Sequence, residues 1–147
     1  MLSQESIIMF TNSLKQGNAG LGQAIAHFTK NGYGVALPLT DSEDWDLIAS
    51  KDGQLYKVQV KSSGQMPDLV EAFEISVKGG NNGKNLTCKY VNEQDWDLLF
   101  LYHIKTELTA LIPKDKITVK NYISFGKQSK YKEFIINSGR GAMVATA

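Results

Sequence analysis

The sequence predicts an α/β domain in which a mixed β-sheet is flanked by helices. Three observations predict it. Residues 21–30 repeat apolar side chains at helical spacing, and residues 55–61 alternate polar and apolar side chains as a half-buried strand does. Residues 98–102 form an unbroken apolar run, which is typical of a strand buried on both faces. The length of 147 residues and the hydrophobic content of 42% predict a single globular domain, residues 1–147.

Two helices are expected ahead of the first strand. The first covers residues 3–14 and the second residues 21–30, because both repeat apolar side chains one helical turn apart. Gly17 and Gly20 lie between them and are expected to break the chain there. Gly32 follows the second helix and suits the left-handed conformation that ends many helices.

A predicted β-hairpin organises the rest of the chain. Its strands lie within residues 43–49 and 54–61, and the Asp52–Gly53 pair between them is a strong signal for a tight turn. Pairing of these strands brings an acid, an amide and an ammonium group together, a combination that can hold a divalent cation and polarise a phosphate. The three residues are Asp46, Gln59 and Lys61.

Further strands follow from alternating or continuous apolar residues. They are expected at residues 33–39, 73–77, 98–102, 107–113 and 122–125, with a helical turn at 114–117, a loop at 79–85, and either a strand or a helix at 128–136. The run Asp95–Leu99 echoes the run Asp44–Ile48. No Gln-x-Lys follows the second copy, so its carboxylates are interpreted as structural.

Charge and cysteine content bound the function only loosely. The net charge is +1, but residues 114–147 carry seven Lys or Arg against two acids, which gives this basic C-terminal segment +5 and leaves −4 for the first 113 residues. Such a segment can face phosphates or simply form a solvated lysine surface. Cys88 is the single cysteine, which excludes an intramolecular disulfide. Without a signal peptide or an 18-residue apolar run, the chain is expected to be soluble and cytoplasmic, with no membrane partner.

The hairpin and its surroundings resemble the PD-(D/E)-XK nuclease superfamily, whose fold is a restriction-endonuclease-like core. The likeness covers residues 15–117, and within the superfamily it points to the branch of Holliday-junction resolvases and the cyanobacterial group I intron homing endonuclease, which also carries Gln-x-Lys. The matching pieces are Gly20–Gln23 opening a helix, Asn31–Val35 with Pro38, Trp45–Ile48, Val58–Ser63, Asp97–Tyr102 and Leu111–Pro113.

The resemblance implies roles for individual residues. Asp46, Gln59, Lys61 and Gln23 take the catalytic positions, and Asp46, Gln59 and the backbone carbonyl of Val60 take the metal-ligand positions. The implied cofactor is Mg²⁺, with Mn²⁺ as a possible substitute. The implied partner is double-stranded DNA. A homodimer or homotetramer is expected, because cutting both strands of a duplex needs two sites and one chain offers one.

One departure from the family pattern leaves alternatives open. Many relatives have a glutamate where this chain has Gln23, and Gln59 likewise offers a neutral amide. The site can hold a single ion with Asp46 as its main anion, the chain can be a naturally weakened or engineered form, or Asp44 or Glu43 can supply the missing charge.

Three classes of function therefore compete. The first is a metal-dependent DNA endonuclease, with a site-specific homing-type enzyme favoured over a Holliday-junction resolvase. The second is a non-catalytic DNA-binding protein on a nuclease scaffold, which Gln23 and Gln59 motivate. The third is a structural domain with no role at nucleic acids, which predicts no DNA binding even at low salt.

Overall fold

The computed structural model describes residues 13–64, 73–79, 88–126 and 129–139. Residues 3–12 of the helix expected at 3–14, most of the loop expected at 79–85, and residues 127–128 and 140–147 of the basic C-terminal segment lie outside these ranges. Ser13 and Leu14 belong to α2. The described elements follow in chain order: α2 (Ser13–Lys30), β1 (Gly34–Ala36), β2 (Leu47–Lys51), β3 (Gln54–Ser63), β4 (Phe73–Ser76), η1 (Val91–Glu93), β5 (Leu98–His103), β6 (Thr109–Pro113), η2 (Lys114–Lys116), β7 (Tyr122–Phe125), η3 (Lys132–Phe134) and β8 (Ile135–Asn137).

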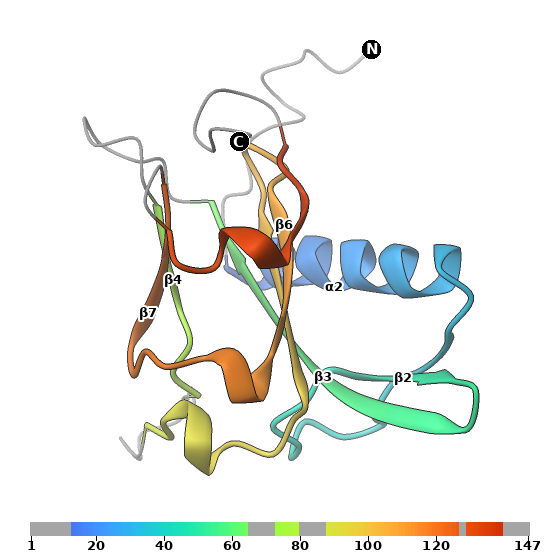
Figure 1. Cartoon of the computed structure of the whole chain (residues 1–147). Helices are drawn as coiled ribbons and strands as arrows, with labels where there is room; N and C mark the ends of the chain where they lie inside the picture. Colours follow the sequence, from blue (N-terminus) through green and yellow to red (C-terminus); the bar gives the residue numbers. More distant parts are fainter. Residues whose placement is uncertain (1–12, 65–72, 80–87, 127–128, 140–147) are drawn as a thin grey trace.

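Six strands form the central sheet in the order β1-β2-β3-β5-β6-β8, and β4 pairs with β7 in a second, two-stranded sheet. Strands β3 and β5 are parallel and the other neighbours are antiparallel, so the central sheet is mixed, as expected. Figure 1 shows α2 on one side of the central sheet and the β4–β7 pair on the other. The expected α/β class is thus confirmed, although within the described residues a small sheet, not a second α-helix, covers the other face.

The predicted break at Gly17 and Gly20 is wrong, because α2 runs continuously through both residues. Gly20 is buried, and a Cβ atom added to it lies 2.9 Å from the Ser62 Cβ atom on β3. This glycine therefore lets the helix approach the sheet closely and does not interrupt it. The expected helix end is confirmed, since Gly32 follows α2 with a φ angle of 83°. No helix among the described residues is both long and apolar enough to cross a membrane.

The predicted hairpin is confirmed. Strands β2 and β3 pair antiparallel with Leu47 opposite Val58, and Asp52 and Gly53 form the turn with φ angles of 53° and 77°. Positive φ at both turn positions matches the right-handed twist of the strands, which explains the Asp-Gly pair. Strand β5 is almost wholly buried, as its apolar run predicts.

Three segments differ from their predicted extent or type. The strand expected at residues 33–39 is limited to β1, because Pro38 and the polar residues after it leave the sheet. The strand expected at 107–113 begins only at Thr109 in β6. The ambiguous segment at 128–136 contains both a helical turn, η3, and the first residues of an edge strand, β8.

Two apolar clusters lie on the two faces of the central sheet. Val58 and Val60 belong to the cluster beneath α2, together with Phe100. Because side chains alternate along a strand, Gln59 and Lys61 point to the opposite face. That face carries the larger cluster, which the β4–β7 pair covers. The polar residues of β3 therefore lie beside β4 and on the far side of the sheet from α2.

Candidate active site

Asp46 is fixed to β3 by its backbone and its side chain. Its backbone N–H donates to the Val58 carbonyl at 2.8 Å, and its Oδ2 atom accepts the Val60 N–H at 2.7 Å. The Gln59 Nε2 atom donates to the same Oδ2 at 2.9 Å. Asp46 thus extends the antiparallel pairing of β2 and β3 by one residue. These hydrogen bonds hold its carboxylate against β3 beside Gln59.

Lys61 lies two residues further along β3 and on the same face as Gln59. Its Nζ atom donates to the Lys78 carbonyl, just after β4, at 3.2 Å. Asp46, Gln59 and Lys61 line one cavity of about 280 Å³. The structure therefore brings together the three hairpin residues that the sequence analysis selected, and the Lys61 amine lies on the same side of the sheet as the Asp46 carboxylate.

Burial shifts both charged groups of this trio toward their neutral forms. Burial raises the pKa of Asp46, and the Val60 N–H and the charge of Lys61 oppose that shift. Burial also lowers the pKa of Lys61, against the attraction of Asp46. The two groups attract each other, but burial is the larger influence on both pKa values.

Other acids enlarge the negative charge of the cavity. Asp41, Glu43 and Asp44 line it beside Asp46, while Lys61 and Lys89 are its ammonium groups, so its lining carries a formal charge of −2. The Lys89 Nζ atom lies 3.0 Å from the Asp44 Oδ2 atom. The Asp95 N–H donates to the same Oδ2 atom, also at 3.0 Å.

The contacts of Asp44 decide its charge state and separate it from Glu43. Burial acts to raise the pKa of Asp44, but the Asp95 N–H and Lys89 together bring that pKa below its usual value. Asp44 is therefore ionised and engaged with Lys89. Glu43 is exposed at the rim of the same cavity. Both candidates for the missing acid are thus adjacent to the trio, and Glu43 is the one without a described ion-pair partner.

Gln23 is not brought together with the other candidates. It is exposed on α2 and lines a different hollow, of about 220 Å³, with His27, Lys30 and Asn137 among its neighbours. The reason is packing, since Ala24 and Phe28 hold α2 on the face of the sheet opposite to Lys61. The catalytic role that the family resemblance implies for Gln23 stays a prediction.

The structure adds Gln94, which the sequence analysis did not select. This buried residue also lines the cavity. Its Nε2 atom donates to the carbonyls of Val77 and Lys89 at 3.0 and 3.1 Å, and its Oε1 accepts the Trp96 Nε1–H at 2.8 Å. Gln94 therefore ties the end of β4, which holds Lys61, to the segment before β5. The contact with Val77 spans 17 residues, so no local pattern could have indicated it.

The oxygen atoms of the trio fit a hard divalent cation only in part. Among the described residues, no three His, Cys, Asp or Glu side chains are grouped to hold a metal. Asp46 and the Val60 carbonyl can donate oxygen, but Gln59 turns its Nε2 atom toward both, at 2.9 and 3.3 Å. Rotating the amide end for end brings its oxygen there. Mg²⁺ is commonly bound by one or two carboxylates, several waters and substrate phosphate, so this small donor set fits it.

The central sheet thus presents a carboxylate, an amide and a lysine at one cavity, the combination on which the resemblance to nucleases rests. In agreement, a family model described as PD-(D/E)XK endonuclease matches residues 11–134. The chain belongs to the PD-(D/E)XK endonuclease family and is a nuclease by descent. The resemblance stated from sequence is thereby confirmed at the level of the family.

Two individual proteins are similar to this chain. Protein 5.3 of Escherichia phage T7 is 28% identical over 104 residues, which cover 70% of this chain and 81% of that protein. The solved structure of a bacterial homing endonuclease, I-Ssp6803I, superposes with a TM-score of 0.66 at 24% identity, over 84% of this chain and 86% of that one. At this identity the second likeness establishes the shared fold.

Proposed function

We propose that this protein is a Mg²⁺-dependent endonuclease that hydrolyses phosphodiester bonds in DNA. One observation carries the proposal: a half-buried carboxylate and a half-buried lysine line one cavity, whose lining has a formal charge of −2. DNA phosphates are anionic and avoid such a cavity unless a cation accompanies them. A divalent ion held by Asp46, the Val60 carbonyl and Gln59 would supply charge neutralisation and an activated water.

The chain's own residues then have distinct tasks. Asp46 is held by two hydrogen bonds to Oδ2 from described residues, so its second oxygen faces away from that pair. The Lys61 ammonium group is oriented by its hydrogen bond to the Lys78 carbonyl. Its remaining protons can bind a non-bridging phosphate oxygen or orient the attacking water. Its lowered pKa makes it readier to give up a proton than an exposed lysine.

We infer a homo-oligomer and a homing-type role as the finer form of this proposal. Each chain has one trio, and cutting both strands of a duplex at one place needs two of them. The homing-type role is supported by the Gln-x-Lys spacing and by the fold shared with a bacterial homing endonuclease. A Holliday-junction resolvase, which also cuts two strands, is the alternative within the same chemistry.

The direct test is cleavage of a linear duplex, a single strand and a four-way junction, each with and without Mg²⁺. We expect cleavage only with the metal, and loss of cleavage in Lys61→Met. Lys57→Met is the matched control, because Lys57 lies on the same face of β3 but pairs with Asp95 at the surface, at 2.7 Å. Absence of cleavage of every substrate by wild type, with Mg²⁺ or Mn²⁺, would contradict the proposal.

A non-catalytic DNA-binding protein is the second candidate, and the orientation of Gln59 favours it. In the structure the amide nitrogen satisfies Asp46, so the carboxylate is partnered without any cation. Gln59→Glu separates the two candidates, because a second carboxylate strengthens a cation site. A gain in Mg²⁺-dependent cleavage indicates a weakened enzyme, and unchanged DNA binding without cleavage indicates a binder. Gln54→Glu adds the same charge at the far end of β3 and serves as the control.

A further inference from the structure

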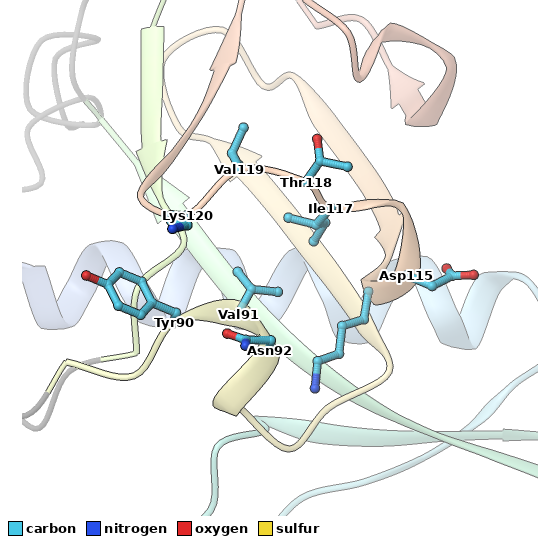
Figure 2. A pocket seen from close by; sticks show the side chains of 9 residues that line it. Tyr90, Val91, Asn92, Asp115, Ile117, Thr118, Val119 and Lys120 are labelled. Carbon is cyan, nitrogen blue, oxygen red and sulfur yellow. The ribbon is translucent and has the colours of Figure 1, made fainter.

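A second and larger cavity, of about 580 Å³, shares no lining residue with the active-site cavity. Figure 2 shows Tyr90 and Lys120 on one flank of it, Asp115 on the other, and Val91 and Ile117 between them. The lining comes from the η1 segment and from the chain that follows β6. It comprises Tyr90, Val91, Asn92, Lys114, Asp115, Ile117, Thr118, Val119 and Lys120.

The lining of this cavity combines apolar and polar side chains. Val91 is a buried member of the large apolar cluster, and Ile117 and Val119 pack against the same cluster. Asn92 and Lys120 are exposed, and neither side chain has a hydrogen-bond partner among the described residues. Apolar side chains with unused donors and acceptors beside them suit a heterocycle that carries polar edges.

Tyr90 adds an aromatic surface to the lining. Its side chain is 44% exposed, although its backbone is fixed, because its N–H donates to the Glu93 carboxylate at 2.7 Å. An exposed ring on a fixed backbone loses little entropy when a second ring stacks on it. Such tyrosines are the usual stacking platforms for unpaired bases in nucleic-acid-binding proteins.

The linings of the two cavities adjoin along the chain. Lys89 lines the active-site cavity and the next residue, Tyr90, lines this one. The Lys114 Nζ atom donates to the backbone carbonyl of Gln94, whose side chain lines the active-site cavity. One bound DNA strand can therefore contact both linings.

The charges of the two cavities differ in sign. Lys114 and Lys120 against Asp115 give the second cavity a formal charge of +1, compared with −2 for the active-site cavity. The first needs a cation before it can accept phosphate, whereas the second attracts the DNA backbone directly.

We propose that the second cavity binds an unpaired nucleobase of the strand that is cut. This inference rests on the proposed function and names its substrate class. Bases inside a continuous duplex are stacked and paired, so their faces cannot reach Tyr90. An extrahelical, frayed or branch-point base has lost those partners already, so no unpairing energy opposes its entry. The preferred substrate is accordingly DNA with an unpaired nucleotide close to the cut, which favours the alternative of a branched substrate over the continuous duplex of a homing-type enzyme.

The test uses the full chain, without metal so that the DNA stays intact, and two matched oligonucleotides. One is a continuous duplex, and the other carries a single bulged 2-aminopurine, whose fluorescence falls when it stacks on an aromatic ring. We expect tighter binding of the bulged DNA and quenching on binding. Tyr90→Ala should remove the quenching and weaken this binding by about 5- to 100-fold, the range of base–aromatic stacking. Tyr90→Phe should retain both, and Asn92→Ala should weaken binding of the bulged DNA more than binding of the duplex.

Tyr122→Ala is the matched control, because Tyr122 lies on β7, is 51% exposed and does not line the cavity. Equal weakening of binding by Tyr90→Ala and Tyr122→Ala would overturn the proposal. Equal binding of bulged and continuous DNA by wild type would do the same. So would a Tyr90→Ala variant that changes the oligomeric state and leaves the quenching intact. These failures are distinct from failure of the proposed function. If wild type cleaves DNA while the cavity variants behave like it, only this inference is lost, whereas a wild type that cleaves no DNA contradicts the nuclease itself.

Discussion

Two segments of nearly identical sequence border β3 on either side. Asp44–Ile48 leads into β2 and Asp95–Leu99 leads into β5, and both strands pair with β3. The aspartates at their centres make contacts of the same kind. Asp46 donates its N–H to the Val58 carbonyl and accepts the Val60 N–H, while Asp97 donates to the Lys57 carbonyl and accepts the Lys57 N–H at 2.8 Å. Each segment thus attaches a carboxylate to the backbone of β3, although β2 pairs with β3 antiparallel and β5 pairs with it parallel.

The surroundings of the two aspartates differ. Asp97 is exposed, and its neighbour Asp95 forms a surface ion pair with Lys57. Asp46 is half-buried beside Gln59 and Lys61, at the end of β3 that β4 covers. The comparison teaches that a Trp-Asp segment fixes a carboxylate onto a strand in either position. Its chemistry then depends on which part of β3 it meets and on how much water is excluded there.

The largest effect is expected from exchanging the two carboxylates for amides. Asp46→Asn should reduce the single-turnover rate of DNA cleavage by about 10²- to 10³-fold or more, because the charge that attracts the cation is lost. Asp97→Asn should leave that rate at the wild-type level, since an amide oxygen can still accept the Lys57 N–H. Equal loss of activity in both variants would show that the backbone contact, and not the site, controls cleavage.

The two lysines on the same face of β3 provide the next contrast. Lys61→Met should abolish most of the cleavage without lowering the free energy of unfolding, because burial already disfavours the Lys61 charge. Lys57→Met should change neither quantity measurably, because surface ion pairs contribute little. Urea unfolding and the cleavage rate, measured on the same preparations, test this. A large loss of stability in Lys61→Met would contradict the assignment of Lys61 as a functional residue.

Substitutions at the glycines of α2 test whether displacing β3 is by itself enough to reduce DNA cleavage, as Asp46→Asn is expected to do. Gly20→Ala places a methyl group 2.9 Å from the Ser62 Cβ atom and should lower the free energy of unfolding by about 1–3 kcal/mol. Gly22→Ala meets nothing within 4 Å and should raise it by about 0.5–1 kcal/mol, because alanine favours the helix. We expect both folded variants to keep Mg²⁺-dependent cleavage, which thermal unfolding and cleavage assays below the melting temperature can check.

The smallest effect concerns pH and lies outside both segments. Burial and the charge of Lys30 lower the pKa of His27 on α2. A histidine with a lowered folded pKa contributes stability that is present above its unfolded pKa of about 6.5 and is lost as the pH falls through the folded value. Wild type should therefore lose stability as the pH falls below about 6.5, and His27→Gln should lose less. Asp97→Asn should follow the wild-type curve, whereas a flat wild-type curve would refute the shift.

Much of the fold was predictable because the signals were local. The Asp52–Gly53 turn, the apolar run of β5 and the glycine after α2 each follow from backbone preferences of neighbouring residues. The effect of Gly20 is not predictable from its neighbours in sequence, because it depends on a contact with another element. The same residue type that breaks a helix in isolation permits close packing when a strand lies against it, and only the contact with Ser62 distinguishes the two cases.

The residues of the candidate site likewise differ in whether the local sequence predicts their position. Asp46, Gln59 and Lys61 were predictable because hairpin register brings them together, and register follows from the turn. Gln23 is carried to the other face of the sheet by the packing of α2, which its sequence position could not reveal. Gln94 joins the site from 35 residues beyond Gln59, through contacts with Val77 and Lys89.

The sequence by itself determined the class of the protein, its hairpin and the three polar residues that one strand register aligns. Those features depend on the conformational preferences of adjacent residues and on the two-residue repeat of a strand. Only the tertiary structure decided which carboxylates share the cavity, where Gln23 lies and that a second cavity borders the first. Each of these depends on burial and on contacts between distant segments, which exist only once the layers have packed together.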